Sequence, residues 1–417
     1  MKVLWITNTI FPEACKELGL PTPFVGGWMY SSADYLLKAF ANIELGVASL
    51  YNGKKLKIIN SERITYYLLP RSTSGHIYDV KLESFWKEVK NQFDPDIVHI
   101  HGTEYPHGLA YVNACGIDNV VVSIQGLVSV IERYYYGGIN EKELKRKVTF
   151  RDLVKLDSIQ KQRVKIQKRG EFEKILINKV QHVIGRTTWD KAHVLAINQK
   201  IFYHFCNESL RGDFYKNNWQ LGECKKHQIF LSQSYYPLKG MHQIIKALPL
   251  ILNYYPDTTI VVAGNDFTKS KKKLGLTGYG KYIRSLINTL GVKENIIFTG
   301  ILTENAMCEK YLESNVFVCP SSIENSSNSI GEAQLLGVPC VASFVGGGPD
   351  MIKNEETGLL YRFEEYEMLA ILVCRIFSDD EFANILSRNG KAIAMKRHDK
   401  QKIIENLNSI YNSICKK

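Results

Sequence analysis

The sequence lacks the patterns that identify several large classes of protein. Its nine cysteines are scattered and never form a Cys-x-x-Cys pair, so neither a disulfide framework nor a zinc module is indicated. The longest clean apolar run, at 368–374, is far shorter than the roughly 20 residues that a membrane-spanning helix needs. The short apolar start, at 1–6, lacks the length and the cleavage site of a signal peptide. We therefore expect a reducing, cytoplasmic environment.

Several common catalytic signatures are absent as well. The sequence contains no Gly-Lys-Ser/Thr phosphate loop, no His-Glu-x-x-His zinc motif, no Gly-x-Ser-x-Gly nucleophile turn and no Gly-x-Gly-x-x-Gly dinucleotide fingerprint. It also has no low-complexity tract and no fixed-period repeat. The function must therefore be sought in other arrangements of residues.

What the sequence does contain is typical of a large globular protein. Its 417 residues are 45% hydrophobic and 23% charged, and this length predicts two or three domains. The formal net charge is +11, but residues 142–179 alone hold 13 Lys or Arg against 5 Asp or Glu. The excess of positive charge therefore belongs mainly to one segment.

Short apolar runs alternate with helical patterns along the whole chain. This alternation predicts α/β domains with parallel sheets, in which ligands bind at the carboxyl ends of the strands. The runs that we interpret as buried strands are 3–5, 97–100, 120–124, 182–184, 229–231, 259–263, 296–299, 316–319 and 340–343. A polar stretch at 208–226 separates two such series, so we predict two Rossmann-like halves, 1–207 and 208–397, facing a cleft.

The most informative stretch is 316–361, where a strand, a polar loop and a helix follow one another. Glu324 and Glu332 have seven residues between them, and a helix that begins near Ser329 places Glu332 about one turn inside. Free N–H groups in the first turn of this helix would form an anion site suited to a diphosphate. The residues that supply them are Asn328, Ser329 and Ile330. Glu332 could accept two ribose hydroxyls; the alternative is a simple capping box of Ser329 and Glu332.

This stretch resembles glycosyltransferase family 4, which comprises retaining, nucleotide-sugar-dependent enzymes of the GT-B fold, including bacterial polysaccharide-type glycosyltransferases. Two glutamates separated by seven residues are a hallmark of that family. Residues 237–240, Pro-Leu-Lys-Gly, are similar to its lysine–glycine loop, and residues 295–300 to its x-x-x-Phe-x-Gly strand. Gly26 and Gly27 are similar to the diglycine that approaches the donor. The resemblance implies a GT-B fold whose C-terminal helix, within 398–417, crosses back to the N-terminal domain.

The resemblance also implies roles for three charged residues. Glu332 would hold the ribose, Glu324 would contact the donor sugar, and Lys239 would bind the phosphates. An ammonium group fixed there would stabilise the negative charge that builds up on the departing diphosphate. Because Lys239 and the helix N-terminal amides would supply this stabilisation, neither a metal nor another cofactor is expected.

Two positions depart from the family pattern. The arginine that commonly precedes the lysine by five or six residues is replaced by Ser234 and Gln233. Hydroxyl or amide donors, or another basic residue such as Arg186, would have to take its part. The strand at 120–124 ends at Gln125, where many members have a histidine, so any general base must be sought elsewhere.

The segment 97–104 offers candidates for the acceptor side. His99 and His101 share one face of a predicted strand, and His101, nearer the strand end, is the better candidate for a catalytic group. We predict that Glu104 and Gln125 bind the acceptor. The simpler alternatives are hydrogen-bonded histidines in the core and a glutamate on the surface.

The basic segment, residues 142–179, reads as one or two helices with lysine and arginine opposite an apolar face. Three tyrosines, at 134–136, stand before it. Tyrosines beside a basic amphipathic helix suit an anionic membrane surface. A solvated helix face is an equally open alternative. Nucleic acid is not expected as a partner, because only Phe150 and Phe172 interleave with the charge.

The sequence thus predicts a retaining hexosyltransferase that moves a sugar from a UDP or GDP sugar to a glycan or a lipid-linked glycan, in surface polysaccharide biosynthesis. Such an enzyme would work in the cytoplasm or at the inner face of the cell membrane. Two alternatives stay open: a sugar-nucleotide epimerase of the same fold, and a non-catalytic protein that binds a nucleotide sugar or a nucleic acid.

Overall fold

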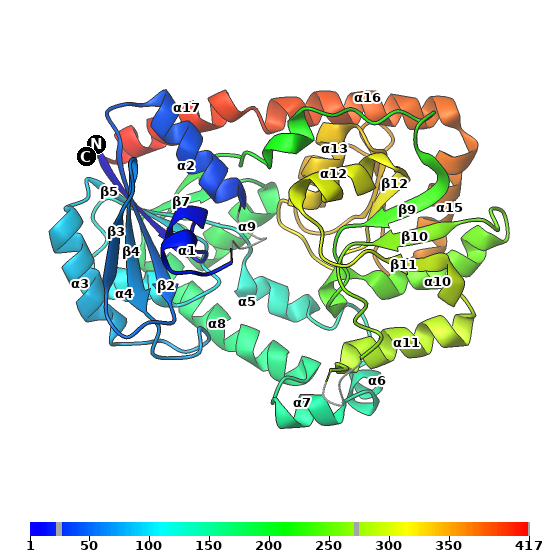
Figure 1. Ribbon diagram of the computed structural model, residues 1–417, viewed down its shortest axis with the longest axis horizontal. Helices are drawn as coiled ribbons and strands as arrows, with labels where there is room; N and C mark the ends of the chain where they lie inside the picture. The colour runs from blue at the N-terminus through cyan, green and yellow to red at the C-terminus, as the bar shows by residue number, and fades with distance from the viewer. Residues whose placement is uncertain (22–26, 271–274, 416–417) are drawn as a thin grey trace. The chain divides into compact units, whose positions relative to one another are not determined.

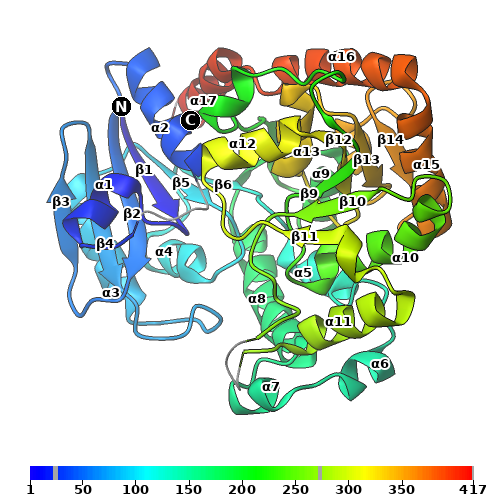
Figure 2. The same cartoon turned by 45° about the vertical axis from the view of Figure 1, so that its right-hand side comes forward.

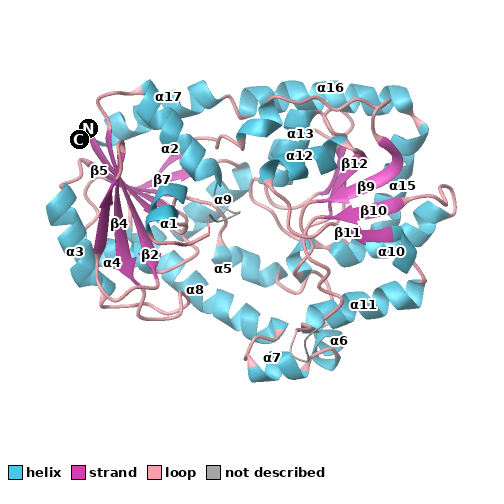
Figure 3. Cartoon of the chain, in the orientation of Figure 1, coloured by secondary structure: helices cyan, strands magenta, loops and turns pink. Residues whose placement is uncertain are grey.

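The computed structural model describes residues 1–21, 27–270 and 275–415, and these residues group into two compact units. Each unit is built on one sheet, drawn in magenta in Figure 3, with helices packed against it. The predicted fold class, two Rossmann-like α/β domains, is therefore confirmed.

The two units divide the chain unevenly. The first unit consists of Met1–Glu132, Lys165–Ser209 and His398–Lys417, and the second unit of Arg133–Val164 and Leu210–Arg397. The predicted boundary places residues 133–164 in the first half of the chain. They group with the second unit because they bond to its backbone and side chains: His242 Nε2 donates to Gly137 O at 2.8 Å, and Asp152 Oδ2 accepts from Gly278 N at 2.8 Å.

The sheet of the first unit has eight strands in the order β3-β4-β2-β1-β5-β6-β7-β8. All neighbouring strands are parallel except β3, which pairs antiparallel with β4 at the edge. The strands are β1 (Lys2–Thr7), β2 (Glu44–Tyr51), β3 (Lys57–Asn60), β4 (Ile64–Pro70), β5 (Ile97–His101), β6 (Val120–Ser123), β7 (His182–Gly185) and β8 (Phe202–Phe205).

Helices cover both faces of this sheet, so its central strands are buried on both sides. Along β1, Leu4 and Ile6 belong to one apolar cluster, and Val3 and Trp5 to another on the opposite face. The helices that contribute to the first cluster are α3 (Leu82–Phe93), α4 (His107–Cys115), α8 (Ile159–Lys179) and α9 (Thr188–Ile197). Those that contribute to the second are α1 (Pro12–Glu17), α2 (Gly27–Ala39) and α17 (Lys400–Cys415). A short helix, α5 (Val128–Ile131), and a 3-10 turn, η1 (Glu132–Tyr134), follow β6.

Helix α17 confirms the predicted C-terminal helix, and it packs in the first unit beside α2 (Figure 1). Its apolar side chains join the cluster around Val3 and Trp5. They are Ile403, Ile404, Leu407, Ile410, Tyr411 and Ile414. Helix α17 thus completes the apolar cluster around β1.

The sheet of the second unit has six parallel strands in the order β11-β10-β9-β12-β13-β14. They are β9 (Lys225–Leu231), β10 (Thr259–Val262), β11 (Ile296–Phe298), β12 (Ser314–Cys319), β13 (Cys340–Ser343) and β14 (Leu359–Tyr361). Strand β12 lies near the centre and is buried along its whole length.

Figures 1 and 2 show α12 and α13 on one side of this second sheet and α10 and α11 on the other. The helices of the unit are α6 (Glu141–Arg146), α7 (Phe150–Val154), α10 (Met241–Leu252), α11 (Gly278–Leu290), α12 (Glu304–Leu312), α13 (Asn328–Leu336), α14 (Gly348–Met351), α15 (Tyr366–Ser378) and α16 (Asp380–Arg397). Three 3-10 turns complete it: η2 (Gly212–Tyr215), η3 (Pro237–Lys239) and η4 (Lys293–Asn295). Most of α13 is buried, which fixes its first turn against the sheet edge.

The nine predicted strands are all confirmed, but the sequence did not reveal β2, β3, β4, β8 or β14. The basic segment was also predicted incompletely. It forms α6, α7 and α8 rather than one or two helices, and Leu156, with a φ of 49°, lies in the break between α7 and α8. The predicted apolar face does not extend over the first part of the basic segment, where Leu153 and Leu156 are 62% and 63% exposed.

Within the described residues, no helix is both long enough and apolar enough to cross a membrane.

A chain of buried hydrogen bonds ties α17 to the first sheet. The Trp5 indole N–H donates to the Tyr411 hydroxyl at 3.0 Å, so the single hydroxyl proton of Tyr411 is free for Nδ1 of His99, at 2.6 Å. Nε2 of His99 then carries the ring proton and donates to Ser123 Oγ at 2.5 Å. His99 is therefore a hydrogen-bonded core residue. Burial, together with the neighbouring His101, lowers its pKa well below the usual value.

We predict that Tyr411→Phe lowers the free energy of unfolding by about 1 to 3 kcal/mol, because it leaves the Trp5 N–H and His99 Nδ1 buried without partners. Thermal and urea unfolding of the full chain measure this loss. Tyr254→Phe is the matched control, since Tyr254 is 70% exposed. Equal stability of the two variants would contradict the role given to Tyr411.

Candidate functional site

Lys239 and Glu324, two of the residues predicted to contact the donor, come together at the carboxyl edge of the second sheet. Lys239 lies in η3, which follows β9, and Glu324 lies in the loop between β12 and α13. Lys239 Nζ and Glu324 Oε1 are 2.6 Å apart, although 85 positions separate them in the sequence. Parallel strands explain this meeting, since all their carboxyl ends lie at one edge.

The Lys239–Glu324 ion pair is mostly buried, with side chains only 17% and 16% exposed. Ser321 Oγ also donates to Glu324 Oε1, at 2.7 Å, so the carboxylate is held from two sides. Burial alone would lower the pKa of Lys239, but the negative charge of Glu324 outweighs it and raises that pKa above its usual value. Lys239 is therefore a fixed positive charge at neutral pH.

Two glycines let the backbone close tightly around this pair. Gly240 has a φ of 66°, and a Cβ at that position would collide with the carbonyl oxygen of Pro320. Gly346 has a φ of 54°, and a Cβ there would collide with the carbonyl oxygen of Glu324. Next to it, Gly347 N donates to the same Glu324 oxygen at 3.0 Å. Gly240 of the lysine–glycine loop, together with Gly346 and Gly347, thus positions the loop that carries Glu324.

The first turn of α13 begins at Asn328, one residue before the predicted start. Its N-cap, Ser327, makes no capping hydrogen bond through its side chain. The N–H groups of the first turn, at Asn328, Ser329 and Ile330, are therefore donors that this N-cap leaves for a ligand. The alternative of a capping box between Ser329 and Glu332 is wrong, because Ser329 is inside the helix and Glu332 has another partner.

That partner is Arg211, which no sequence motif identifies. Its guanidinium grips Glu332 with two bonds, Nε to Oε1 at 2.7 Å and Nη2 to Oε2 at 2.8 Å. Burial raises the pKa of Glu332, and the bonds and positive charge of Arg211 oppose that rise. Arg211 stands inside the polar stretch that separates the two predicted halves, and nothing in its spacing links it to a residue 121 positions away.

The acceptor-side candidates lie in the first unit. His101 is buried against Trp5, at 4.5 Å between ring centroids, and stacked on His99 at 3.7 Å. Neither of its ring nitrogens has a hydrogen-bond partner among the described residues, and burial lowers its pKa to about 3. His101 also lines a small cavity of about 40 Å³ together with Trp28, which follows Gly27 at the start of α2. Gly26 lies outside the described residues.

Glu104 and Gln125 occupy different surroundings in the same unit. Glu104 accepts from Asn8 Nδ2 at 3.2 Å, and burial raises its pKa to about 7. Gln125 Nε2 donates to Glu208 Oε1 at 2.7 Å. Arg186, a candidate replacement for the missing arginine, is paired with this same Glu208 and donates to Ile124 O at 2.9 Å. Arg186 is thus engaged within the first unit.

The sequence matches known proteins mainly through the second unit. Residues 214–393 match the family of glycosyl transferases group 1. YtcC of Bacillus subtilis (strain 168), provisionally named a glycosyltransferase, is 27% identical over 180 residues, which are 43% of each chain. The capsular polysaccharide biosynthesis glycosyltransferase CapM of Staphylococcus aureus is 25% identical over 178 residues, 43% of this chain and 44% of CapM. The matched part thus spans less than half the length of these curated relatives.

Two solved structures show the same fold over nearly the whole chain. The sucrose-phosphate synthase of Thermosynechococcus elongatus superposes with a TM-score of 0.71 at 16% identity and covers 99% of both chains. HepE of Anabaena, solved with UDP-glucose, gives a TM-score of 0.67 at 16% identity and covers 99% of this chain and 100% of its own. The predicted GT-B fold is thereby confirmed, and the predicted resemblance is confirmed in the second unit, where residues 214–393 match the family of glycosyl transferases group 1.

Proposed function

We propose that the protein is a retaining glycosyltransferase that takes its sugar from a UDP or GDP sugar. The observation that carries this proposal is the buried Lys239–Glu324 pair at the edge where α13 presents an uncapped first turn. Glu332 stands one turn further along the same helix. The matched family region includes all three charged residues, and the binding of UDP-glucose by HepE, which has the same fold, supports a UDP sugar as donor.

In the proposed complex, the diphosphate lies at the α13 amides and Lys239. An ammonium group has three donors, so Lys239 can keep its bond to Glu324 and donate to a phosphate oxygen as well. Each carboxylate oxygen accepts more than one hydrogen bond, so Glu332 can receive ribose hydroxyls while Arg211 orients it. Glu324, held by Ser321 and Lys239, would contact the donor sugar.

The proposed transfer exchanges one bond at the anomeric carbon. The bond to the diphosphate oxygen breaks, the acceptor oxygen bonds on the same face, and the hydroxyl proton passes to the leaving phosphate. Negative charge grows on the diphosphate as the bond breaks, so a fixed ammonium stabilises the transition state more than the ground state. In this scheme Lys239 and the helix amides supply the charge stabilisation, with no metal or cofactor.

We place the acceptor, a glycan or a lipid-linked glycan of surface polysaccharide biosynthesis, on the first unit. The proposed contacts of the acceptor are His101, Glu104 and Gln125. Because the pKa of His101 is about 3, this ring is neutral at pH 7 and can accept a hydrogen bond from a hydroxyl group. So weak a base holds a proton poorly, and the leaving phosphate therefore remains the proposed proton acceptor.

We further propose that the enzyme works on the cytoplasmic face of an anionic membrane. The α7 tip, which we define as Phe150, Leu153, Val154 and Leu156, is 55 to 71% exposed at every position. Exposed basic residues surround this tip in the sequence, among them Arg146 and Lys155. Apolar side chains flanked by positive charge suit the interface of a bilayer with anionic lipids.

Lys239→Ala should lower turnover by about a hundredfold, the scale of losing one charge contact made in the transition state. Transfer from UDP-glucose and GDP-mannose to a panel of glycan acceptors measures this loss. Lys293→Ala, with a side chain 68% exposed, is the matched control. Unchanged kinetics in Lys239→Ala would remove the lysine from the mechanism, and donor consumption without any acceptor would favour an epimerase.

Glu332→Gln should weaken binding of the nucleotide sugar by about 10- to 100-fold, because a charged acceptor of hydrogen bonds is lost. Calorimetric titration measures the affinity, and a thermal melt of the same variant checks that the neutral partner of Arg211 leaves the fold intact. Glu294→Gln, at a side chain 92% exposed, should bind like the unmodified protein. If both variants bind equally well, Glu332 does not hold the ribose.

Binding to vesicles that contain anionic lipid should fall at least tenfold when Phe150 and Leu153 are both replaced by serine, since burying each side chain contributes about 2 kcal/mol. Sedimentation with vesicles at low and high salt measures this. Ile301→Ser, at a position 62% exposed elsewhere in the second unit, is the control. If the double replacement does not change vesicle binding, the α7 tip does not contact the membrane and is a solvated surface.

A further inference from the structure

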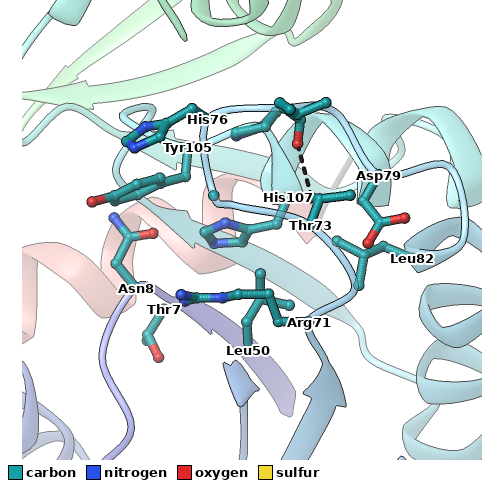
Figure 4. Close-up of a pocket in the computed structure, with 13 residues that line it drawn as sticks. Thr7, Asn8, Leu50, Arg71, Thr73, His76, Asp79, Leu82, Tyr105 and His107 are labelled. Carbon is teal, nitrogen blue, oxygen red and sulfur yellow. Dashed lines mark hydrogen bonds between the residues drawn. The ribbon is translucent and has the colours of Figure 1, made fainter. Parts of the chain in front are cut away.

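A second polar pocket lies in the first unit, and none of the residues assigned above lines it. It opens at the carboxyl edge of the first sheet and has a volume of about 200 Å³ (Figure 4). Thr7 ends β1 and Leu50 lies in β2. Arg71 follows β4 and His107 begins α4, so four separate segments supply the walls of the pocket. In a parallel α/β sheet this edge is where ligands bind.

Arg71 gives the pocket a positive charge that no ion pair among the described residues neutralises. No acidic side chain forms an ion pair with it in the part of the chain that the structure describes, although its side chain lines the pocket. Its charge is close enough to His107 to lower the pKa of that ring. Figure 4 shows the guanidinium beside the His107 ring.

His107 is a buried polar side chain that faces the same space. It is only 6% exposed, and no hydrogen bond to its ring is found among residues 1–21, 27–270 and 275–415. Figure 4 draws its ring in the middle of the lining residues, between Tyr105 and Arg71. Burial, followed by the charge of Arg71, lowers its pKa to about 4, so the ring is neutral at pH 7 and offers one N–H.

The backbone adds donors of the same kind. His107 is the first residue of α4, a helix of nine residues, and its N-cap, Pro106, has no side-chain capping bond. The first N–H groups of this helix and the positive end of its dipole therefore lie at the pocket wall. Guanidinium, imidazole and helix amides all favour a negatively charged oxygen.

The acidic residue of the pocket is already engaged. Asp79 accepts from the Ser72 hydroxyl and, at 3.1 Å, from Lys81 N. Its carboxylate therefore does not neutralise Arg71 by an ion pair. The other titratable side chains in the lining are His76 and Tyr105, and Glu104 lies just outside, bonded to Asn8 of the lining at 3.2 Å.

We propose that this pocket binds the anionic group, a phosphate or a carboxylate, of the acceptor substrate, with Arg71, His107 and the α4 amides as its donors. That the bound molecule is the acceptor rests on the proposed function. That the pocket binds an anion rests on the pocket alone. A volume of about 200 Å³ holds one such group with part of a sugar ring, and not a whole oligosaccharide. Glu104, next to the pocket, is in reach of the neutral part of the same molecule.

The test uses the full chain with selectively ¹³C-labelled histidine, and His107→Asn assigns the His107 signal. Inorganic phosphate and acetate are titrated separately, with glucose as the neutral probe. Because phosphate can also bind at α13, the readout is the His107 signal itself. We expect a saturable shift with phosphate, acetate or both, and none with glucose; the stronger anion identifies the chemical class.

Arg71→Gln should weaken the binding seen at His107 by about tenfold or more, because the charged donor is lost. Arg63→Gln, which removes an exposed arginine of the same unit that is paired with Asp34, should leave it unchanged. No saturable shift with either anion, or equal affinity in Arg71→Gln and Arg63→Gln, would overturn the proposal.

Nucleotide-sugar binding separates this proposal from the proposed function. UDP-glucose and GDP-mannose are titrated into the same protein and into Arg71→Gln, which should bind them equally well because Arg71 lies in the first unit. If no nucleotide sugar binds while phosphate still shifts His107, the proposed function fails and the anion pocket stands. If nucleotide sugar binds but neither anion shifts His107, the pocket proposal fails alone.

Discussion

The fixed direction of parallel strands is the constraint on which the structure depends. It brings every carboxyl end of a sheet to one edge, so short loops from distant parts of the sequence meet there. Lys239 and Glu324 meet in this way across 85 positions, and Thr7, Arg71 and His107 share a pocket for the same reason. The same geometry therefore forms both the Lys239–Glu324 site, where two opposite charges are paired, and the pocket of the first unit, where Arg71 has no ion-pair partner among the described residues.

The charged groups of the second unit are arranged before any substrate arrives. Lys239 with Glu324 and Arg211 with Glu332 are buried opposite charges, and either partner alone would be costly to leave in the interior. Pairing makes their burial tolerable, and the glycines at 240 and 346 allow the backbone to hold them close. Charges that are already in place need no rearrangement when negative charge develops on a leaving group.

The sequence reveals the parts of this protein that depend on local patterns. Buried apolar runs such as 120–124 and 316–319 predicted their strands. Strand β3 was missed because, at the sheet edge, its side chains are largely exposed. Arg211 was missed because a contact across 121 positions leaves no periodic trace.

In the candidate functional site, too, the sequence does not reveal contacts between distant residues. The family pattern located Glu324, Glu332 and Lys239. It did not indicate Ser321, whose hydroxyl donates a hydrogen bond to Glu324. His101 and Arg71 show what local reading cannot supply: an unbonded ring and an unpaired cation are recognised only once every neighbour is known. Arg71 lies outside the basic segment, and a count of charges along the sequence does not distinguish it from other surface arginines.

The packing of α17 on β1 has a consequence for the order in which the chain can fold. During synthesis β1 emerges early, but Tyr411, which satisfies Trp5 and His99, follows all residues of the second unit. The second unit, Arg133–Val164 with Leu210–Arg397, is therefore available to fold while the first still lacks the part of its core that α17 supplies. Helices α1 and α2 can cover part of that apolar face early, but the part that α17 covers stays exposed until α17 is made.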